Sequence, residues 1–124
     1  MVFVFGSNEA GRHGAGAAST AYSRHGAIYG KGVGRAGMSY AIPTKDAQLR
    51  ILSLEDVGSY VQQFIAYATA HPNIDFQVTQ IGCGLAGFTA EEIAPLFAGA
   101  PDNCLFDEAW ETYLPPDAKF WGTF

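Results

Sequence analysis

The sequence predicts a single α/β domain in which helices pack on a central sheet. Short apolar or alternating stretches, typical of strands, alternate along the 124-residue chain with segments of helical periodicity. The length suits one domain, and 48% of the residues are hydrophobic, which is enough for one core. No repeat, linker or low-complexity segment divides the chain, so we expect residues 1–124 to form one compact domain.

Strands and helices alternate through the first half of the chain. Residues 2–5 form a continuous apolar run, which predicts a short strand buried on both faces. Small residues from 15 to 25 predict a helix that Gly26 ends, and residues 39–42 predict the next strand. Because proline cannot donate a hydrogen bond to a neighbouring strand, we expect Pro43 to end that strand.

The second half continues the alternation. Ser53 is the predicted N-cap of the clearest helix, whose apolar residues keep an i, i+3, i+4, i+7 rhythm until Pro72 bars its extension. Residues 75–81 predict a strand. Residues 89–98 predict a helix, which Pro95 should kink or shorten.

The chain ends with a short predicted strand, residues 103–106, and an aromatic tail, residues 110–124. The tail is too aromatic to be disordered. It could join subunits into a homo-oligomer, because exposed aromatic residues commonly mark interfaces. We prefer the alternative in which it folds back and covers the sheet, since a small core with an open edge needs cover.

Composition argues against several classes of protein. The net charge of −5 argues against bulk nucleic-acid binding, which needs a basic surface. No apolar run is long enough to span a membrane, and residues 1–5 lack the length and basic flank of a signal peptide, so we expect a cytoplasmic protein. Cys83 and Cys104 are expected to be reduced thiols, and no histidine or cysteine spacing suits a metal. We therefore expect neither a metal nor a cofactor.

The most informative segment is a glycine-rich loop, residues 81–88 (IGCGLAGF), between a predicted strand and a predicted helix. The helix begins with a capping-box pair, Thr89 and Glu92. Such a loop presents backbone N–H groups where the helix dipole is positive, which suits a phosphate. The alternative is a tight turn without a ligand, because glycine is also common in turns.

A second glycine-rich loop, residues 6–16, also follows a strand and opens a helix. Two such loops could grip two sides of one extended ligand, for example a pyrophosphate between two sugars. An acidic protein can bind such a group when backbone amides supply the positive field. The alternative is that Gly14 and Gly16 only allow the helix to pack closely on the sheet.

A third glycine-rich stretch lies between residues 26 and 37. Residues 32–37 match the letters of the dinucleotide-binding fingerprint, but they precede a strand and open no helix, so that mechanism does not apply. The stretch could be a mobile, ligand-covering loop in which Lys31 and Arg35 screen a polyanion. We favour the alternative, a solvated flexible loop.

The order of these motifs resembles that of macrodomains: Asn8, HGAGAA (13–18), SYAIPTKD (39–46) and IGCGLAGF (81–88). Within that superfamily the chain is most similar to the branch of the terminal ADP-ribose protein glycohydrolases, over roughly residues 2–106. Small uncharacterised proteins of phages and bacteria look similar too. The resemblance implies a three-layer α/β/α fold, with a reduced mixed sheet because the usual N-terminal strands are missing.

The resemblance also implies a ligand, ADP-ribose or a related nucleotide, in a cleft across the strand ends. Loop 82–88 would wrap the pyrophosphate, loop 13–16 would pass beneath the distal ribose, and Phe88 would cap that sugar. Phe106 or Asp107 could reach the adenine. The ligand-contacting residues expected in this way are Ser7, Asn8, Gly14, Ala15, Gly16, Thr44, Gly82, Cys83, Gly84, Leu85, Ala86, Gly87, Phe88 and Phe106.

Catalysis is the second possibility that the resemblance raises. Thr44 and Lys45 match a Thr-Lys pair whose lysine attacks the anomeric carbon of the ADP-ribosyl group. A partly desolvated lysine can serve as such a nucleophile, although Lys45 could also be an exposed lysine or a partner for a phosphate. His13 is the other candidate catalytic residue, since it lies in the loop expected near the scissile sugar.

The family's catalytic aspartates are missing. Ala86 stands where one branch has an aspartate, and Ala17 and Ala18 stand where the other has one. Glu9 or Asp46 could carry protons in their place. Two function classes remain: a module that binds ADP-ribose, and a hydrolase that removes ADP-ribose from a macromolecule or a small ester. The missing aspartates lead us to favour binding.

Overall fold

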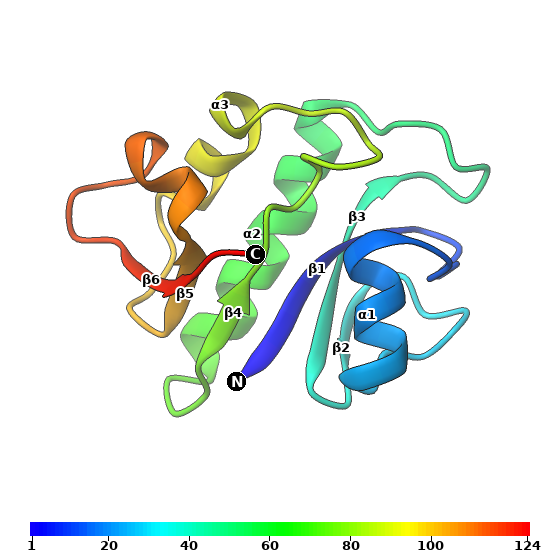
Figure 1. Cartoon of the computed structure of the whole chain (residues 1–124), viewed down its shortest axis with the longest axis horizontal. Coiled ribbons are helices and arrows are strands. Elements are labelled where there is room, and N and C mark those ends of the chain that lie inside the picture. The colour runs from blue at the N-terminus through cyan, green and yellow to red at the C-terminus, as the bar shows by residue number, and fades with distance from the viewer.

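The computed structural model describes residues 1–124 as an alternating series of strands and helices (Figure 1). The strands are β1 (Val2–Asn8), β2 (Gly34–Ala36), β3 (Ser39–Lys45), β4 (Phe76–Val78), β5 (Cys104–Asp107) and β6 (Lys119–Gly122). The α-helices are α1 (Gly16–Arg24), α2 (Leu54–Ala70) and α3 (Ala90–Ile93), and the 3-10 helices are η1 (Ala94–Phe97) and η2 (Glu108–Tyr113). No helix is both long and apolar enough to cross a membrane.

All six strands belong to one mixed sheet with the order β2-β3-β1-β4-β5-β6. Only β2 pairs antiparallel to its neighbour, and the other strand pairs are parallel. The parallel strands β1, β3 and β4 therefore end at the same edge, which is the upper one in Figure 1. The prediction of an α/β fold with a mixed sheet is confirmed.

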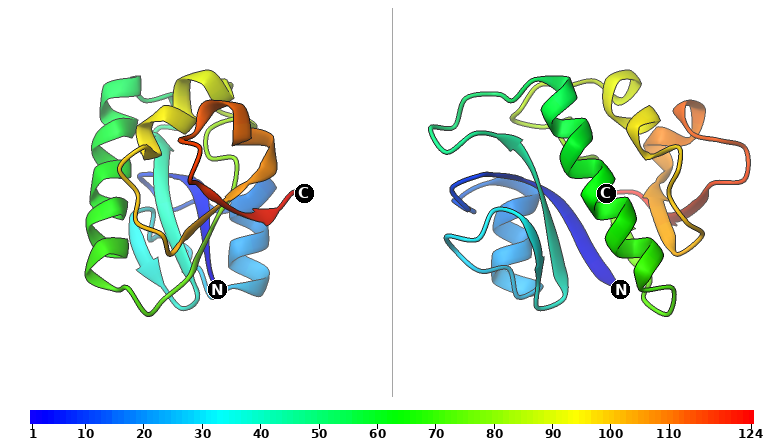
Figure 2. Two further views of the ribbon diagram at one scale, coloured as in Figure 1. Left: turned by 90° about the vertical axis from the view of Figure 1, so that its left-hand side faces the viewer. Right: turned by 180° about the vertical axis from the view of Figure 1, so that it is seen from behind.

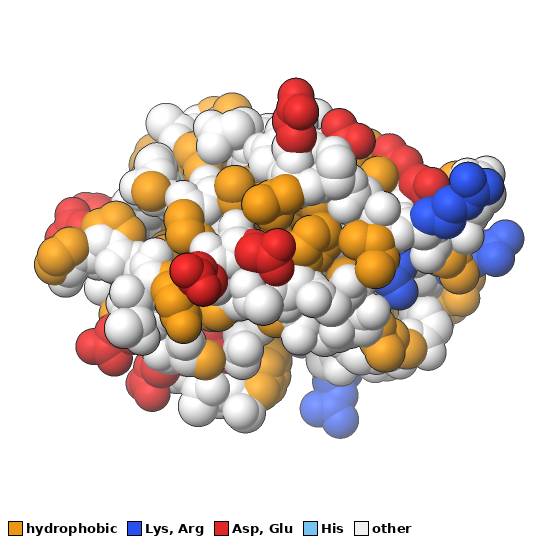
Figure 3. Space-filling model, turned by 90° about the horizontal axis from the view of Figure 1, so that it is seen from above, with side chains coloured by type: hydrophobic (Ala, Val, Ile, Leu, Met, Phe, Trp, Pro, Cys, Tyr) orange, Lys and Arg blue, Asp and Glu red, His pale blue; other side chains and the backbone are white.

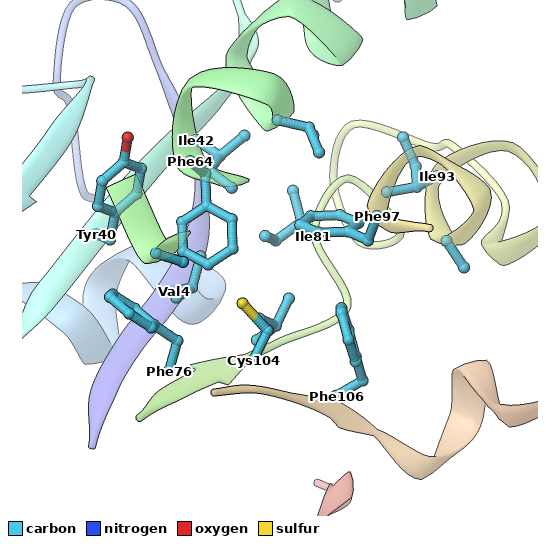
Figure 4. Close-up of a cluster of buried hydrophobic side chains, with 14 of the residues drawn as sticks. Val4, Tyr40, Ile42, Phe64, Phe76, Ile81, Ile93, Phe97, Cys104 and Phe106 are labelled. Carbon is cyan, nitrogen blue, oxygen red and sulfur yellow. The ribbon is translucent and has the colours of Figure 1, made fainter. Parts of the chain in front are cut away.

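Helices cover both faces of the sheet, so the domain has three layers. Figure 2 shows α1 and α2 on opposite sides of the strands. Strand β1 shows why: Val2 and Val4 join a large core with α2, whereas Phe3 and Phe5 join a smaller one with α1. The continuous apolar run at the N-terminus therefore contributes side chains to two cores, because alternate side chains of a strand point to opposite faces. Figure 4 shows part of the larger core around Phe64 of α2.

The expected end of the second long strand is wrong. Strand β3 continues through Pro43 to Lys45, although the proline was expected to stop it at residue 42. The short strand β2 pairs only with Ser39 to Ala41, so no strand lies on that side of β3 at Pro43. A proline is tolerated where the strand edge has no partner, because no N–H donor is needed there.

Two other expected elements are shorter than the pattern suggested. The strand predicted for residues 75–81 comprises only Phe76–Val78, and the chain then turns into the glycine-rich loop. The predicted helix 89–98 is a single α-helical turn, α3, followed by η1, which contains Pro95. The predicted capping box is confirmed: Thr89 Oγ1 accepts from the N–H of Glu92, and the Glu92 carboxylate accepts from the N–H of Thr89.

The aromatic tail folds back onto the sheet, as preferred from the sequence. Helix η2 buries Trp110 completely in the large core, and β6 adds a parallel strand beside β5. The indole Nε1 of Trp121 donates to the carbonyl oxygen of Val78 at 2.9 Å, which ties the tail to β4. The tail therefore supplies both an edge strand and part of the core.

Candidate ligand cleft

A cleft of about 510 Å³ lies at the edge where β1, β3 and β4 end. Figure 3 looks onto this edge, and Lys and Arg side chains gather at its right-hand end, over the loops that follow β1 and β3. The predicted site residues that line the cleft are Ser7, Asn8, Gly14, Ala15, Gly16, Thr44, Lys45, Gly82, Gly84, Leu85 and Ala86. The structure thus brings the two glycine-rich loops and the Thr-Lys pair around one space.

The N-terminus of α1 forms one wall of the cleft. Five consecutive backbone N–H groups, those of residues 14–18, have no acceptor in the protein. The N-cap residue, Ala15, carries no side chain that could accept from them. Because these residues line the cleft, the positive end of the helix dipole opens into it.

The loop after β4 forms the facing wall. Its shape is fixed by its own backbone bonds, among them Cys83 N–H to Gln80 O at 3.1 Å and Phe88 N–H to Gly82 O at 2.8 Å. Four N–H groups remain without an acceptor in the protein, and their residues all line the cleft: Gly82, Gly84, Leu85 and Ala86. Two sets of unused donors therefore border the same space.

Two cationic side chains, Arg12 and Lys45, also line the cleft. Neither makes a hydrogen bond or an ion pair through its side chain, and the one ion pair of the protein joins Lys119 to Asp102 elsewhere. No aspartate or glutamate lines the cleft. In a protein with a net charge of −5, the charged side chains that line this space are therefore all positive.

The polar side chains at the ends of β1 and β3 are occupied by structural bonds. Ser7 Oγ donates to the carbonyl oxygen of Gly32 at 2.5 Å, and Thr44 Oγ1 donates to that of Ser7 at 3.3 Å. The Asn8 amide bonds the backbone of Arg12 through both its nitrogen and its oxygen. These groups shape the base of the cleft and leave ligand binding mainly to the backbone donors and cations.

Five expected site residues do not line the cleft: His13, Cys83, Gly87, Phe88 and Phe106. His13 is 2% exposed, and its Nε2 is bonded to backbone carbonyls. Phe88 packs against the large core and over Gly82, so it caps no open space. Phe106 lies in that core (Figure 4), where its ring packs against those of Phe97 and Trp110.

Cys83 also turns toward the core, and its thiol is a poor nucleophile. The Sγ atom lies 3.6 Å from the carbonyl oxygen of Ile81, and the side chain packs against the large core. Burial raises the pKa of the Cys83 thiol, an effect that Trp110 partly opposes. A raised pKa lowers the share of reactive thiolate.

The acidic residues expected as proton carriers are committed elsewhere. Glu9 accepts a hydrogen bond from the hydroxyl of Tyr60 on α2. Asp46 Oδ1 accepts from the N–H groups of Gln48 and Arg50, each at 2.9 Å, and so closes the turn after β3. No histidine lines the cleft either, so Lys45 has no carboxylate or imidazole partner there.

Nine residues that line the cleft were not among the predicted site residues, and the larger side chains among them include Arg12, Tyr29, Leu49 and Gln80. Arg12 could have been found, since it stands inside the first glycine-rich loop. Leu49 is the one non-glycine residue with a positive φ, +64°, and no local signal marks it. Lys31 and Arg35, for which screening of a polyanion was one of two possibilities, do not line the cleft. Lys31 bonds the carbonyl oxygen of Arg35, and Arg35 bonds Gly37 and Tyr67.

Comparison of the chain with protein-family models, with curated proteins and with solved structures finds no match. The resemblance to macrodomains therefore stays a prediction, and the interpretation of the cleft depends on its own geometry.

Proposed function

We propose that this protein binds ADP-ribose, or a related nucleotide with a pyrophosphate, in the cleft at the strand ends. One observation carries the proposal: two sets of unused backbone N–H groups border a cleft that holds two free cations and no carboxylate. Phosphate oxygens are strong acceptors with negative charge, so they match both the donors and the field.

The size and lining of the cleft favour a nucleotide over a single phosphate. A volume of about 510 Å³ lies within the usual range of small-molecule sites. Tyr29, Leu49 and Leu85 line the cleft with large side chains that are substantially exposed, at 53%, 44% and 76%. Exposed apolar surface beside a phosphate site suits the rings of a nucleoside or a sugar.

Hydrolysis of an ADP-ribosyl bond is the second candidate, and one observation favours it. Lys45 lines the cleft, and its amine makes no hydrogen bond or ion pair within the protein, so no protein group holds the amine away from a bound sugar. The absence of aspartate, glutamate and histidine from the lining weighs against it, because general acid–base chemistry needs a proton carrier within reach. Binding therefore remains the favoured function.

Calorimetric titration of the 124-residue protein with ADP-ribose tests the proposal, with ADP, NAD, AMP and inorganic pyrophosphate as comparison ligands. Binding of ADP-ribose in preference to AMP supports it, because AMP has one phosphate and cannot bridge both loops. A lack of heat with every ligand would overturn the proposal. Release of free ADP-ribose from an ADP-ribosylated substrate would favour the second candidate.

A further inference from the structure

We propose that Tyr29 recognises a ring joined to the bound phosphate and that the buried His13 is the residue that positions it. The inference rests on the proposed function and adds a specificity residue to it. Residues 28–32, called the strap below, carry Tyr29 to the cleft although they lie beyond α1 in the chain. Three independent sets of contacts fasten the strap to the first glycine-rich loop.

Backbone and hydroxyl bonds form the first set. The N–H of Gly30 donates to the carbonyl oxygen of Gly11 at 2.9 Å, and the N–H of Lys31 donates to that of Ile28 at 3.0 Å. Ser7 Oγ donates to the carbonyl oxygen of Gly32 at 2.5 Å. The strap is thus a closed turn that is bonded to the end of β1 at one point and to the following loop at another.

Contact between two backbones is the second set. A Cβ atom on Gly32 would collide with the carbonyl oxygen of Asn8, and one on Gly11 would collide with the backbone of Gly30 and Lys31. Only glycine allows this close approach. The strap therefore lies directly on the first loop with no side chain between them.

The imidazole of His13 provides the third set. Its Nε2 lies 3.0 Å from the carbonyl oxygen of Ile28 and 3.1 Å from that of Lys31. Because carbonyl oxygens only accept, Nε2 carries the hydrogen and donates to both. These two carbonyls stand on either side of Tyr29, so one buried side chain holds both flanks of that residue.

Tyr29 contacts two aromatic side chains and remains half exposed beside the cleft. Its ring meets His13 at 5.7 Å and Tyr22 at 5.3 Å between centroids, both edge to face, yet the residue is 53% exposed. Its hydroxyl oxygen lies 3.8 Å from where a Cβ on Gly14 would stand, beside the unused donors of α1. A sugar or base attached to a phosphate on those donors would meet the exposed part of this ring.

The test compares ligands with and without a ring. Dissociation constants for ADP-ribose, ADP, ribose 5-phosphate and inorganic pyrophosphate are measured for the wild type, Tyr29→Ala and Tyr29→Phe. We expect Tyr29→Ala to lower the affinity for ADP-ribose by about 10-fold, the effect of losing one stacking side chain, and to leave the affinity for pyrophosphate unchanged. Tyr29→Phe should bind like the wild type. Tyr113→Ala, at a residue that is 43% exposed and does not line the cleft, is the matched control.

If Tyr29→Ala binds ADP more weakly but ribose 5-phosphate as well as the wild type does, the ligand ring that Tyr29 contacts is the base. If it binds ribose 5-phosphate more weakly but ADP equally well, that ring is the sugar. Either result supports the inference. Unchanged ADP-ribose affinity in Tyr29→Ala, or an equal loss for pyrophosphate, would overturn it while the proposed function stands. If the wild type binds none of the four ligands, the proposed function fails and this inference fails with it.

The positioning role of His13 has its own test. His13→Ala should reproduce the selective loss of Tyr29→Ala, and the double variant should lose no more than either single one. His13→Gln should recover much of the affinity, because its amide nitrogen can donate from nearly the same position as Nε2. Should His13→Ala fail to fold, His13→Gln and Tyr29→Ala decide the question. An additive loss in the His13→Gln, Tyr29→Ala double variant would overturn the positioning role.

Discussion

The side-chain amide of Asn8 bonds both polar groups of the Arg12 backbone: Nδ2 donates to the Arg12 carbonyl and Oδ1 accepts from the Arg12 N–H, each at 2.9 Å. A single buried residue at the end of β1 therefore closes the loop that leads to α1. This closure sets where Arg12 and the first N–H groups of α1 lie relative to the cleft.

Replacing Asn8 should weaken both the fold and the ligand affinity. Asn8→Ala leaves the Arg12 N–H and carbonyl without partners, at a cost of about 1 to 3 kcal/mol in the free energy of unfolding. Asn8→Asp keeps an acceptor for the N–H and should lose less. Chemical denaturation and calorimetric titration of both variants check this. Equal stability of Asn8→Ala and the wild type would contradict it.

A side chain at Gly84 should block the cleft without disturbing the fold. Gly84 lines the cleft, has no positive φ, and has open space where a Cβ would stand. Gly84→Val should therefore reduce ADP-ribose affinity by about 10-fold or more, because the side chain separates the phosphate from the backbone donors. Unfolding free energy should change by less than about 1 kcal/mol.

The matched control for this variant is Gly99→Val. Gly99 also has open space and no positive φ, but it lies outside the cleft. Gly87 is a poorer test, since its φ of +80° would strain any side chain. Equal affinities of Gly84→Val and Gly99→Val would argue against this loop as the phosphate site.

Lys45 should contribute charge to ligand binding. Lys45→Ala should lower the affinity for ADP-ribose about 5- to 10-fold, because it removes a charge-assisted hydrogen bond to the ligand. Lys45→Arg keeps the charge and should retain most of the affinity. The difference should shrink as salt is added. Lys119→Ala, which removes a lysine outside the cleft, serves as the control. Turnover that disappears in Lys45→Ala with affinity retained would instead support the hydrolase.

Asn103, which lies outside the cleft, should contribute to the stability of the fold. Its Nδ2 donates to the carbonyl oxygens of Ala68, His71 and Ile74 at 3.0, 3.0 and 2.8 Å, which joins the end of α2 to the turn before β4. Asn103→Ala should lower the free energy of unfolding by about 2 kcal/mol. Asn73→Ala, in the exposed turn nearby, should change it little. Thermal and urea unfolding measure both.

Tyr60 should make stability fall at alkaline pH. Its hydrogen bond to Glu9, together with burial and nearby negative charge, raises the pKa of Tyr60 from 10.0 to about 12. The fold therefore favours the neutral phenol, so this contribution is complete below pH 10 and is lost as the pH rises through about 12. Tyr60→Phe lacks the contribution, and the stability gap between it and the wild type should narrow between those values.

The measurement is denaturant unfolding of the wild type and Tyr60→Phe at about pH 8 and about pH 11.5. Tyr113→Phe, at an exposed tyrosine, controls for the titration of other phenols. A gap that stays constant with pH would contradict the prediction.

Signals that act over a few residues were readable in the sequence. Ser53 caps α2 by accepting from the N–H of Asp56, and Thr89 and Glu92 form the predicted box, because both involve groups three residues apart. The glycine-rich loops were found for the same reason: the strand, the loop and the helix are consecutive. These local features place most of the unused backbone donors that border the cleft.

Tertiary structure decided what distant segments bring together. Pro43 stays within β3 because β2 ends before it, and Phe88 and Phe106 enter the core because other segments surround them. His13 bonds carbonyls 15 and 18 residues away, which turned an expected catalytic histidine into a buried one and carried Tyr29 into the cleft. The sequence by itself determined the main helices and strands and the two glycine-rich loops of the cleft, since propensity and capping are local, but it did not predict the short strands β2 and β6. Burial and side-chain direction depend on which elements pack together, and only the folded chain settles that.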